Sequence, residues 1–473
     1  MAFPATCSVI MRFLLTCAFC ISWSVASALT AHADQALPPE TKLPPSFGEN
    51  ASRATSFADA NWAQFYHDSV LQALIRTALG QNFDVQIAVQ RIMQASEQVT
   101  ATRANQLPAL EAELAAPTLQ VNGPLPPIFP HEDFAPSITG TVFYEVDLWG
   151  KLRSATAAGR AQLLASEDAR EVVIVTLVSD VATAYFEMRA LDEELDVLDR
   201  LLSDRKKSLT LTQDRYKQGQ ASQLDVDQAQ SLVQDIEATV PTVQQKLKAA
   251  EITLSTLMGT YPQPVPRGLS LTQQISLPAI PEAGLPSALL ERRPDIREAE
   301  QVLIAQHAQI TVARAALFPQ LNLTGSVGAG TYVVDGLFYG PHGLFALVPS
   351  LLYTIFNAGA QKAHMRAAED AERQDLYSYL STVHQSFAEV STSLAGYHNF
   401  GIETVQLHAL TKTDRESVDL ASLRYYEGEG SYSDVLVAQE RYLSASVDLV
   451  EGELDERLAL VNLYAALGGG WQQ

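Results

Sequence analysis

The sequence has only three cysteines in 473 residues, and Cys7, Cys17 and Cys20 all lie in its first 20 positions. The rest of the chain therefore has no disulfide framework, thiol nucleophile or cysteine metal site. Basic residues are also scarce, with 32 Lys and Arg against 54 Asp and Glu. This balance argues against nucleic acid as a partner, because phosphate binding needs a basic surface. The net charge of −22 is spread along the chain without forming an acidic tail.

Motifs of catalysis are absent as well. The nine histidines show no close metal-ligand spacing, and the sequence contains neither a Walker loop nor a G-x-S-x-G elbow. A dense charge cluster surrounds Pro294, and we interpret it as a salt-bridged stretch at a helix start rather than a catalytic pair. Its members are Glu291, Arg292, Arg293, Asp295, Arg297, Glu298 and Glu300. We therefore predict that the protein is not an enzyme and has no cofactor or metal.

Long hydrophobic runs are confined to the N-terminus. An apolar run over 13–28 follows Arg12, is too short for a comfortable membrane span, and precedes a small-x-small pattern that ends at Ala33. These features predict a signal peptide over 1–33. A lipoprotein, cleaved before Cys17 and lipidated there, is the alternative. The following segment, 34–58, is rich in Pro and Ala and is expected to be extended.

The remaining chain contains two copies of one unit. Residues 215–259 align with 424–468 without gaps at an offset of 209, and residues 84–108 align with 295–319 at an offset of 211. We predict a first repeat over 59–265, a linker over 266–285 and a second repeat over 286–473.

Each repeat shows the same order of elements. Helical stretches at 68–106 and 286–317 are each followed by two extended segments and then by a long helical hairpin, at 151–258 and 360–467. Apolar residues recur every three and four positions in these hairpins, as in a coiled coil. A helix over 151–216 would be about 100 Å long. Pro241 is expected to kink the return helix of the first hairpin.

The turns at the hairpin tips carry the same chemistry twice. A glycine suited to the left-handed conformation is followed by a serine suited to an N-cap and, three residues later, by an aspartate that completes a capping box. These residues are Gly219, Ser222 and Asp225 in the first repeat, and Gly428, Ser431 and Asp434 in the second. The residues alone favour helix capping over a functional role for the two aspartates.

The extended segments have the pattern of outer-membrane strands. We expect strands over about 109–121, 136–148, 319–333 and 345–356. The second and third alternate apolar and polar residues over about ten positions, which is typical of strands with lipid on one side and water on the other. The other two contain Pro117 and Pro349, which predict bends or bulges. Trp149, at the end of the second segment, is interpreted as a membrane-interface anchor.

Four strands cannot close a barrel, and open edges in lipid would leave backbone groups unpaired. Two copies would give eight strands with a filled interior, whereas three copies would give twelve strands and a water-filled lumen. We therefore predict an α+β membrane protein that forms a homotrimer. A 12-stranded barrel in outer-membrane lipid would continue into a second barrel of long α-helices.

Several motifs resemble a known family. LLERRPDIREAE at 289–300 and ARAALFP at 313–319 resemble the most distinctive stretch of the outer-membrane factors of tripartite efflux pumps, the NodT/OprM/FusA branch of the TolC-like proteins. YEVDLWGKL at 144–152 and LGGGW at 467–471 resemble two further signatures. The resemblance spans roughly 59–471.

The resemblance implies a homotrimeric channel in the outer membrane of a Gram-negative bacterium, with a large periplasmic extension. It implies passive export of drugs and other small toxic molecules. The partners implied are a periplasmic adaptor, or membrane fusion protein, and an inner-membrane transporter, either RND-type or an aromatic-acid exporter. Export of aromatic acids such as fusaric acid is a narrower expectation, because no residue identifies a substrate.

The same resemblance implies a periplasmic gate and adaptor docking near the two hairpin tips. The position that often carries the gating aspartate is Val437 here, and Asp434 lies one turn nearer the tip on the same helix face. The gate candidates are Asp225, Asp227, Asp434, Val437 and Arg441. The docking candidates are Gly219, Ser222, Leu224, Gly428, Ser431 and Val435.

Two other functions remain open at this point. One is the outer-membrane conduit of a type I protein-secretion system, which would have the same fold. The other is a periplasmic coiled-coil scaffold without a channel. The alternating strands argue against the scaffold, and the NodT-like signatures favour small-molecule efflux over protein secretion.

Overall fold

A computed structural model describes residues 61–115, 137–277, 286–330 and 342–469. All of them belong to one compact unit, Pro45–Gln473. The predicted signal peptide, the alternative lipid site Cys17 and the expected extended segment 34–58 lie outside the described residues.

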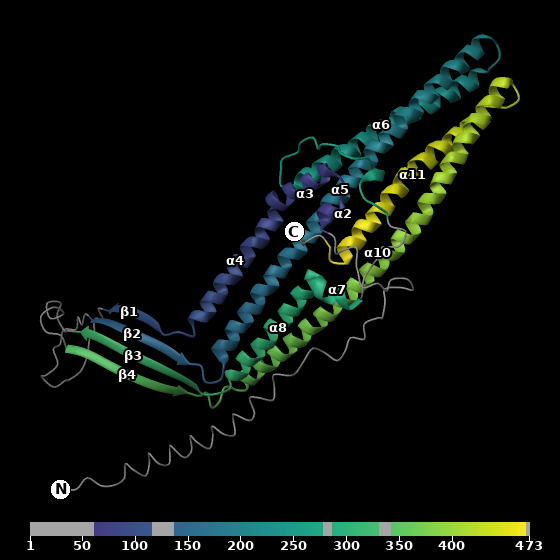
Figure 1. The fold of residues 1–473 in the computed structure, drawn as a ribbon. Helices are drawn as coiled ribbons and strands as arrows, with labels where there is room; N and C mark the ends of the chain where they lie inside the picture. Colours follow the sequence, from purple (N-terminus) through teal and green to yellow (C-terminus); the bar gives the residue numbers. More distant parts are fainter. Residues whose placement is uncertain (1–60, 116–136, 278–285, 331–341, 470–473) are drawn as a thin grey trace, which may run out of the picture. The chain divides into compact units, whose positions relative to one another are not determined.

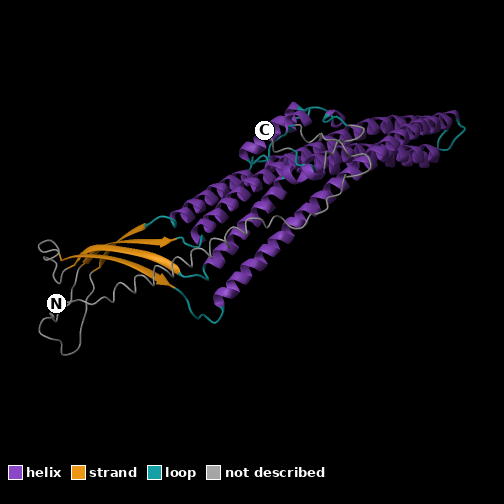
Figure 2. Ribbon diagram, turned by 60° about the horizontal axis from the view of Figure 1, so that its bottom comes forward, coloured by secondary structure: helices purple, strands orange, loops and turns teal. Residues whose placement is uncertain are grey.

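Helices make up most of the described chain (Figures 1 and 2). The first repeat contains α2 (Trp62–Phe65), α3 (Ser69–Gln81), α4 (Phe83–Ala104), α5 (Lys151–Lys217) and α6 (Gln223–Leu257). A short 3-10 turn, Leu271–Gln273, precedes the second repeat. That repeat contains α7 (Pro286–Arg292), α8 (Pro294–Ala315), α10 (Ala360–Glu427) and α11 (Tyr432–Ala466). None of the described helices is long and apolar enough to cross a membrane.

Left-handed glycines end or begin the long helices at the same places in both repeats. Gly219 and Gly428 have φ angles of 76° and 81°, as the sequence predicts for the hairpin tips. Two further pairs, each 209 residues apart, also have positive φ: Gly150 with Gly359, and Gly259 with Gly468. Glycine is favoured there because other residues pay a steric cost in this conformation. The internal repeat is therefore a repeat of backbone geometry and not only of sequence.

The two hairpins each pair a very long helix with a shorter return helix. α5 and α10 have 67 and 68 residues, and α6 and α11 have 35 residues each. α6 continues through Pro241 without interruption. α8 packs against both α5 and α10, whereas α4 packs against α5.

A four-stranded antiparallel sheet lies at one end of these helices (Figure 2). Its strands follow in chain order, β1 (Ala109–Ala115), β2 (Ser137–Val146), β3 (Gln320–Gly330) and β4 (His342–Leu352). The central pair, β2 with β3, joins the two repeats, which the sequence did not predict. β1 and β4 each leave one edge unpaired within the described residues.

Two strands, β2 and β4, differ from the sequence-based expectation. β2 ends at Val146 instead of residue 148, and β4 covers 342–352 instead of 345–356. β4 ends at Leu352 because its partner there is Gln320, the first residue of β3. Pro349 lies inside β4, opposite Leu323. Proline within a sheet is found mainly on edge strands and at bulges, and within one chain β4 is an edge strand.

The sheet has one apolar face that continues across all four strands. Leu110 pairs with Val142, Val142 with Gly325, and Gly325 with Leu347. Leu110 and Leu347 are 76% and 67% exposed. Residues one position away, such as Thr141 and its partners Glu111 and Ser326, form the polar face. This is the two-sided pattern of a sheet between lipid and water.

The main hydrophobic core lies near the middle of the helical part. Buried aromatic residues from α2, α5 and α11 meet there, with Tyr66, Tyr185, Phe186 and Tyr464 all less than 2% exposed. The short N-terminal helices and the segment between the repeats close over this core. The hairpin tips extend away from it (Figure 1).

Candidate functional site

The two hairpin tips lie close together at one end of the helices (Figure 1). At the first tip, the backbone N–H of Ser222 donates to Oδ2 of Asp225 at 2.9 Å, and the N–H of Asp225 donates to Oγ of Ser222 at 3.2 Å. At the second tip, the N–H of Ser431 donates to Oδ2 of Asp434 at 3.2 Å. Both predicted capping boxes are present.

A cation-aromatic contact connects the two tips. Nη1 of Arg215, at the end of α5, donates to the carbonyl oxygen of Tyr426 at 2.6 Å. The Arg215 guanidinium lies 4.9 Å from the centre of the Tyr425 ring. Sequence reasoning did not single out these residues, although an Arg-Tyr pair occurs at the same place in both repeats.

Beside this contact, a small hydrophobic cluster holds the tips together. It contains Ala229 from α6 and Tyr425, Tyr432 and Val435 from the second repeat. Val435 is only 1% exposed. It therefore lies in the contact between the tips, and its assignment to adaptor docking stays a prediction. Leu224, another docking candidate, is 64% exposed.

Three of the predicted gate residues form an exposed row on α11. Asp434, Val437 and Arg441 are exposed, whereas Val435 and Ala438 on the adjacent face are buried. The row therefore presents an acidic, an apolar and a basic side chain along about two helical turns.

The first repeat does not duplicate this row. The positions equivalent to Val437 and Arg441 are Gln228 and Leu232, and Leu232 is 5% exposed. Asp225 is only partly exposed, and the remaining candidate, Asp227, accepts a hydrogen bond from Nε2 of Gln223 at 2.8 Å. The two tips thus share their capping chemistry but differ in the surface they present.

The predicted charge cluster lies far from the tips, at the start of α8. Pro294 is the first residue of that helix, as expected. The Arg293 guanidinium donates to the carboxylates of Asp295, at 2.6 Å, and Glu389, at 2.8 Å, and to the carbonyl oxygen of Ala466, at 2.9 Å. The cluster joins α8 to α10 and to the C-terminal end of α11, which confirms the salt-bridge interpretation.

Arg297 continues this network toward α5. It forms ion pairs with Asp168 and with Glu171, the latter at 2.8 Å. Burial is the largest influence on the pKa of Glu171 and raises it, while Arg297 lowers it in part. α8 is thus fastened by charge to both long helices, α5 and α10.

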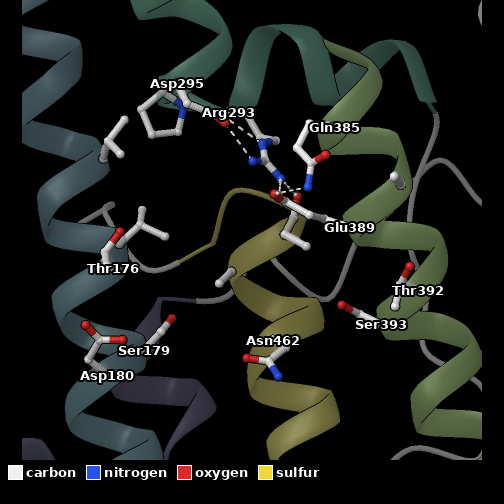
Figure 3. A pocket seen from close by; sticks show the side chains of 16 residues that line it. Thr176, Ser179, Asp180, Arg293, Asp295, Gln385, Glu389, Thr392, Ser393 and Asn462 are labelled. Carbon is white, nitrogen blue, oxygen red and sulfur yellow. Dashed lines mark hydrogen bonds and ion pairs between the residues drawn. The ribbon is translucent and has the colours of Figure 1, made fainter. Parts of the chain in front are cut away.

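A cavity of about 590 Å³ opens beside Arg293 (Figure 3). It is lined on the α5 side by Thr176, Ser179 and Asp180, and on the other side by residues of α10 and α11. Burial raises the pKa of Asp180. The Arg293 side chain turns toward Asp295 and Glu389, so its charge is already neutralised and does not anchor an anion in the cavity.

The junction between sheet and helices has its own connection between the repeats. The Trp149 indole N–H donates to the carbonyl oxygen of Pro319 at 2.7 Å, and its ring stacks on Phe318 with centroids 4.7 Å apart. Trp149 thus ties the first repeat to the second, and its role as a membrane-interface anchor stays a prediction. Among the described residues, no group of three His, Cys, Asp or Glu side chains gathers as a metal site.

The chain matches the model of a family described as "Outer membrane efflux protein" over residues 74–260 and 285–469. It is 33% identical over 438 residues to the toluene efflux pump outer membrane protein TtgC of Pseudomonas putida, covering 91% of this chain and 89% of TtgC. It is 28% identical over 461 residues to the cation efflux system protein CusC of Escherichia coli, covering 96% of this chain and 98% of CusC.

Solved structures share the fold. A crystal structure of CusC matches with a TM-score of 0.84 at 26% identity, covering 93% of this chain and 100% of the other. The open state of the outer membrane channel MtrE of Neisseria gonorrhoeae matches with a TM-score of 0.82 at 29% identity, covering 92% of this chain and 98% of MtrE.

Proposed function

The chain belongs to the outer membrane efflux protein family, and we propose that its cargo is drugs, organic solvents or other small toxic organic molecules, aromatic acids such as fusaric acid included. The protein is an outer-membrane efflux channel of a tripartite pump, and channels of this family are homotrimers that work with an adaptor and an inner-membrane pump.

The similarity to the toluene efflux pump protein TtgC supports the proposed cargo, and the two-sided sheet with its two free edges supports the channel. Three copies bring together twelve strands, which enclose a lumen wide enough for water. The polar faces then line a path for solutes, and the apolar faces meet lipid. CusC, to which the chain is also similar, is named a cation efflux system protein, so a metal cation is the alternative cargo.

For the partners, the tips offer a surface to a periplasmic adaptor. Leu224 is a large apolar side chain with 64% exposure, two residues after the turn at Gly219–Ser222. We assign adaptor docking to this surface. The inner-membrane transporter, RND-type or an aromatic-acid exporter, would select the cargo and supply the energy.

For the gate, we assign the row Asp434, Val437 and Arg441 on α11. Three copies of the row would bring three carboxylates to one level of the channel. There the carboxylates would repel one another and attract cations. Val437 replaces the acidic residue that related motifs often carry. Asp434 therefore supplies the acidic ring in its place.

The gate assignment is tested with Asp434→Asn in planar bilayers. The amide keeps an oxygen that accepts the hydrogen bond from Ser431 but removes the charge, so the helix cap is largely preserved. We expect the inhibition of channel conductance by divalent cations to weaken several-fold. Asp225→Asn, which makes the same change at the other tip, is the matched control and should alter block much less. Unchanged conductance and unchanged cation block in Asp434→Asn would contradict the assignment.

The cargo is tested in a strain that lacks the gene. Sensitivity to toluene, to several antibiotics and to fusaric acid should increase, and plasmid-borne expression of the chain should restore resistance. Export of secreted proteins and tolerance of toxic metal cations are measured in parallel. Loss of a secreted protein without any gain of drug sensitivity would instead favour type I secretion, and a gain of metal sensitivity alone would favour cation efflux.

A further inference from the structure

Both repeats carry both halves of the contact that connects the tips. The first repeat contains Arg215 followed by Tyr216, and the second contains Arg424 followed by Tyr425. Within one chain the contact uses the arginine of the first pair and the tyrosine of the second, because Arg215 reaches Tyr425 and the carbonyl of Tyr426. Arg424 and Tyr216 do not form the equivalent contact within the described chain.

The repeat relation is accurate enough to predict contacts between chains. In the sheet, Ala109 of β1 pairs with Phe143 of β2. The residues 211 and 209 positions later, Gln320 and Leu352, form the corresponding pair of β3 and β4. The left-handed glycines repeat with the same spacing at the ends of the long helices. The two repeats thus agree to the residue at both ends of the structure.

The exposure of the two arginine-tyrosine pairs is unequal. Tyr425 is 6% exposed under Arg215, but its counterpart Tyr216 is 45% exposed, and no arginine lies over its ring among the described residues. Arg424 is exposed, and its hydrogen bond to the carbonyl of Glu429, at 3.4 Å, is long and lies within its own turn.

We infer that Arg424 of each protomer contacts the first hairpin tip of the next protomer in the trimer. Its guanidinium would lie over the Tyr216 ring of the neighbouring chain and donate to the carbonyl of Lys217, as Arg215 does with Tyr425 and Tyr426. The position equivalent to Tyr426 in the first repeat is Lys217. The acceptor is a backbone carbonyl, so this difference in side chain does not affect the hydrogen bond. The Lys217 ammonium is already paired with Asp214 at 2.8 Å.

Three such contacts would close the six tips into a ring in which within-chain and between-chain connections alternate. The inference rests on the trimer of the family and not on the cargo. A guanidinium stacked on an aromatic ring is attracted by the ring quadrupole, and it also donates in the plane of its fork. The two interactions together fix the position of the neighbouring tip.

Cross-linking tests this contact. A chain with Lys217→Cys and Arg424→Cys is assembled in membranes, treated with a short bismaleimide and separated under denaturing conditions. We expect covalent dimers and trimers. The matched control, Arg215→Cys with Tyr426→Cys, places the thiols at the equivalent within-chain contact and should give only monomers. The unsubstituted chain reports any reaction of the cysteines at positions 7, 17 and 20.

A second variant keeps Arg424 in place. With p-benzoylphenylalanine at position 216, irradiation should join the tip of one chain to a peptide near residue 424 of another. A chain that forms heat-stable trimers but gives only monomers with the 217/424 pair would overturn the inference. A photoadduct within one chain, or far from the end of α10, would overturn it as well. Neither readout depends on transport, so the cargo proposal can fail while this contact stands.

Discussion

Asp68 shows how a single buried charge organises the middle of this protein. Its side chain is 1% exposed and caps α3 by accepting from the N–H of Val70 at 2.8 Å. It also accepts from the Tyr185 hydroxyl at 2.9 Å, the N–H of Leu269 at 2.8 Å and Nε2 of Gln274 at 3.0 Å. One carboxylate thus connects the first helices, α5 and the segment between the repeats.

The balance of these effects sets the pKa of Asp68. Burial is the largest influence and would raise the pKa, but the hydrogen bonds from Gln274, Val70, Tyr185 and Leu269 together hold it below its ordinary value of 3.8. A carboxyl with a lowered folded pKa stabilises the fold above its unfolded pKa, and this stabilisation is lost as the pH falls through the folded pKa.

Asp68→Asn should therefore lower stability in a pH-dependent way. We expect a loss of about 2 kcal/mol at pH 7, because hydrogen bonds to a charged acceptor are replaced by weaker ones. The gap between the melting temperatures of the wild type and the variant should stay constant down to about pH 5 and narrow below about pH 4. Asp196→Asn, at an exposed site, is the control and should change the melting temperature little. A gap that does not change with pH would contradict the role of the charge.

Among the elements, the sheet depends most on its neighbours. Its central ladder, β2 with β3, already crosses between the two repeats, whereas β1 and β4 end with free edges. The sheet of the trimer is complete only when β4 pairs with β1 of the next protomer, because unpaired backbone groups in lipid cost several kcal/mol each. The repeat relation that predicts the contact between tips also predicts the register in which β4 of one protomer pairs with β1 of the next. We call this strand pair the seam.

A disulfide should form across the seam at a specific pair. Thr141 pairs with Ser326 in β2 and β3, and the equivalent positions are Ser350 and Ala115 of the next protomer. A chain with Ala115→Cys and Ser350→Cys should oxidise to covalent dimers and trimers. Ala115→Cys with Leu351→Cys should not, because a slip of one residue places the two side chains on opposite faces. Cross-linking of the second pair instead of the first would show a different register.

For the whole molecule, the excess of acidic residues becomes a property of the channel. The chain has 54 Asp and Glu against 32 Lys and Arg, and three copies bring this excess around one lumen. Fixed negative charge near a narrow aqueous path concentrates cations and repels anions. We therefore expect the acidic residues that face the lumen to influence which ions pass.

The open channel should therefore prefer cations. In a KCl gradient across a planar bilayer, the reversal potential at pH 7 should indicate a preference for K⁺ over Cl⁻. Acidification should reduce this preference because protonation removes negative charge. A preference for Cl⁻ at pH 7 would contradict the expectation.

Local patterns in the sequence were sufficient for most of the elements. The 209-residue repeat, the left-handed glycines, the capping boxes and the long hairpins depend on residues near one another in the chain, so spacing reveals them. The alternation along the second and third strands likewise predicted the two faces of the sheet. The missed ends of β4 depended on its partner β3, which begins after Pro319, and one strand alone contains no such information.

The contacts between repeats were decided only in three dimensions. The sequence presents Arg215 and Tyr425 as members of separate repeats, more than 200 residues apart, and it does not predict that Val435 is buried between the tips. The pairing of β2 with β3 and the bond from Trp149 to Pro319 are of the same kind. The sequence by itself determined two copies of one unit, because periodicity and turn chemistry are local. Only the tertiary structure decided how the copies face each other, because packing and burial depend on residues that the chain order keeps apart.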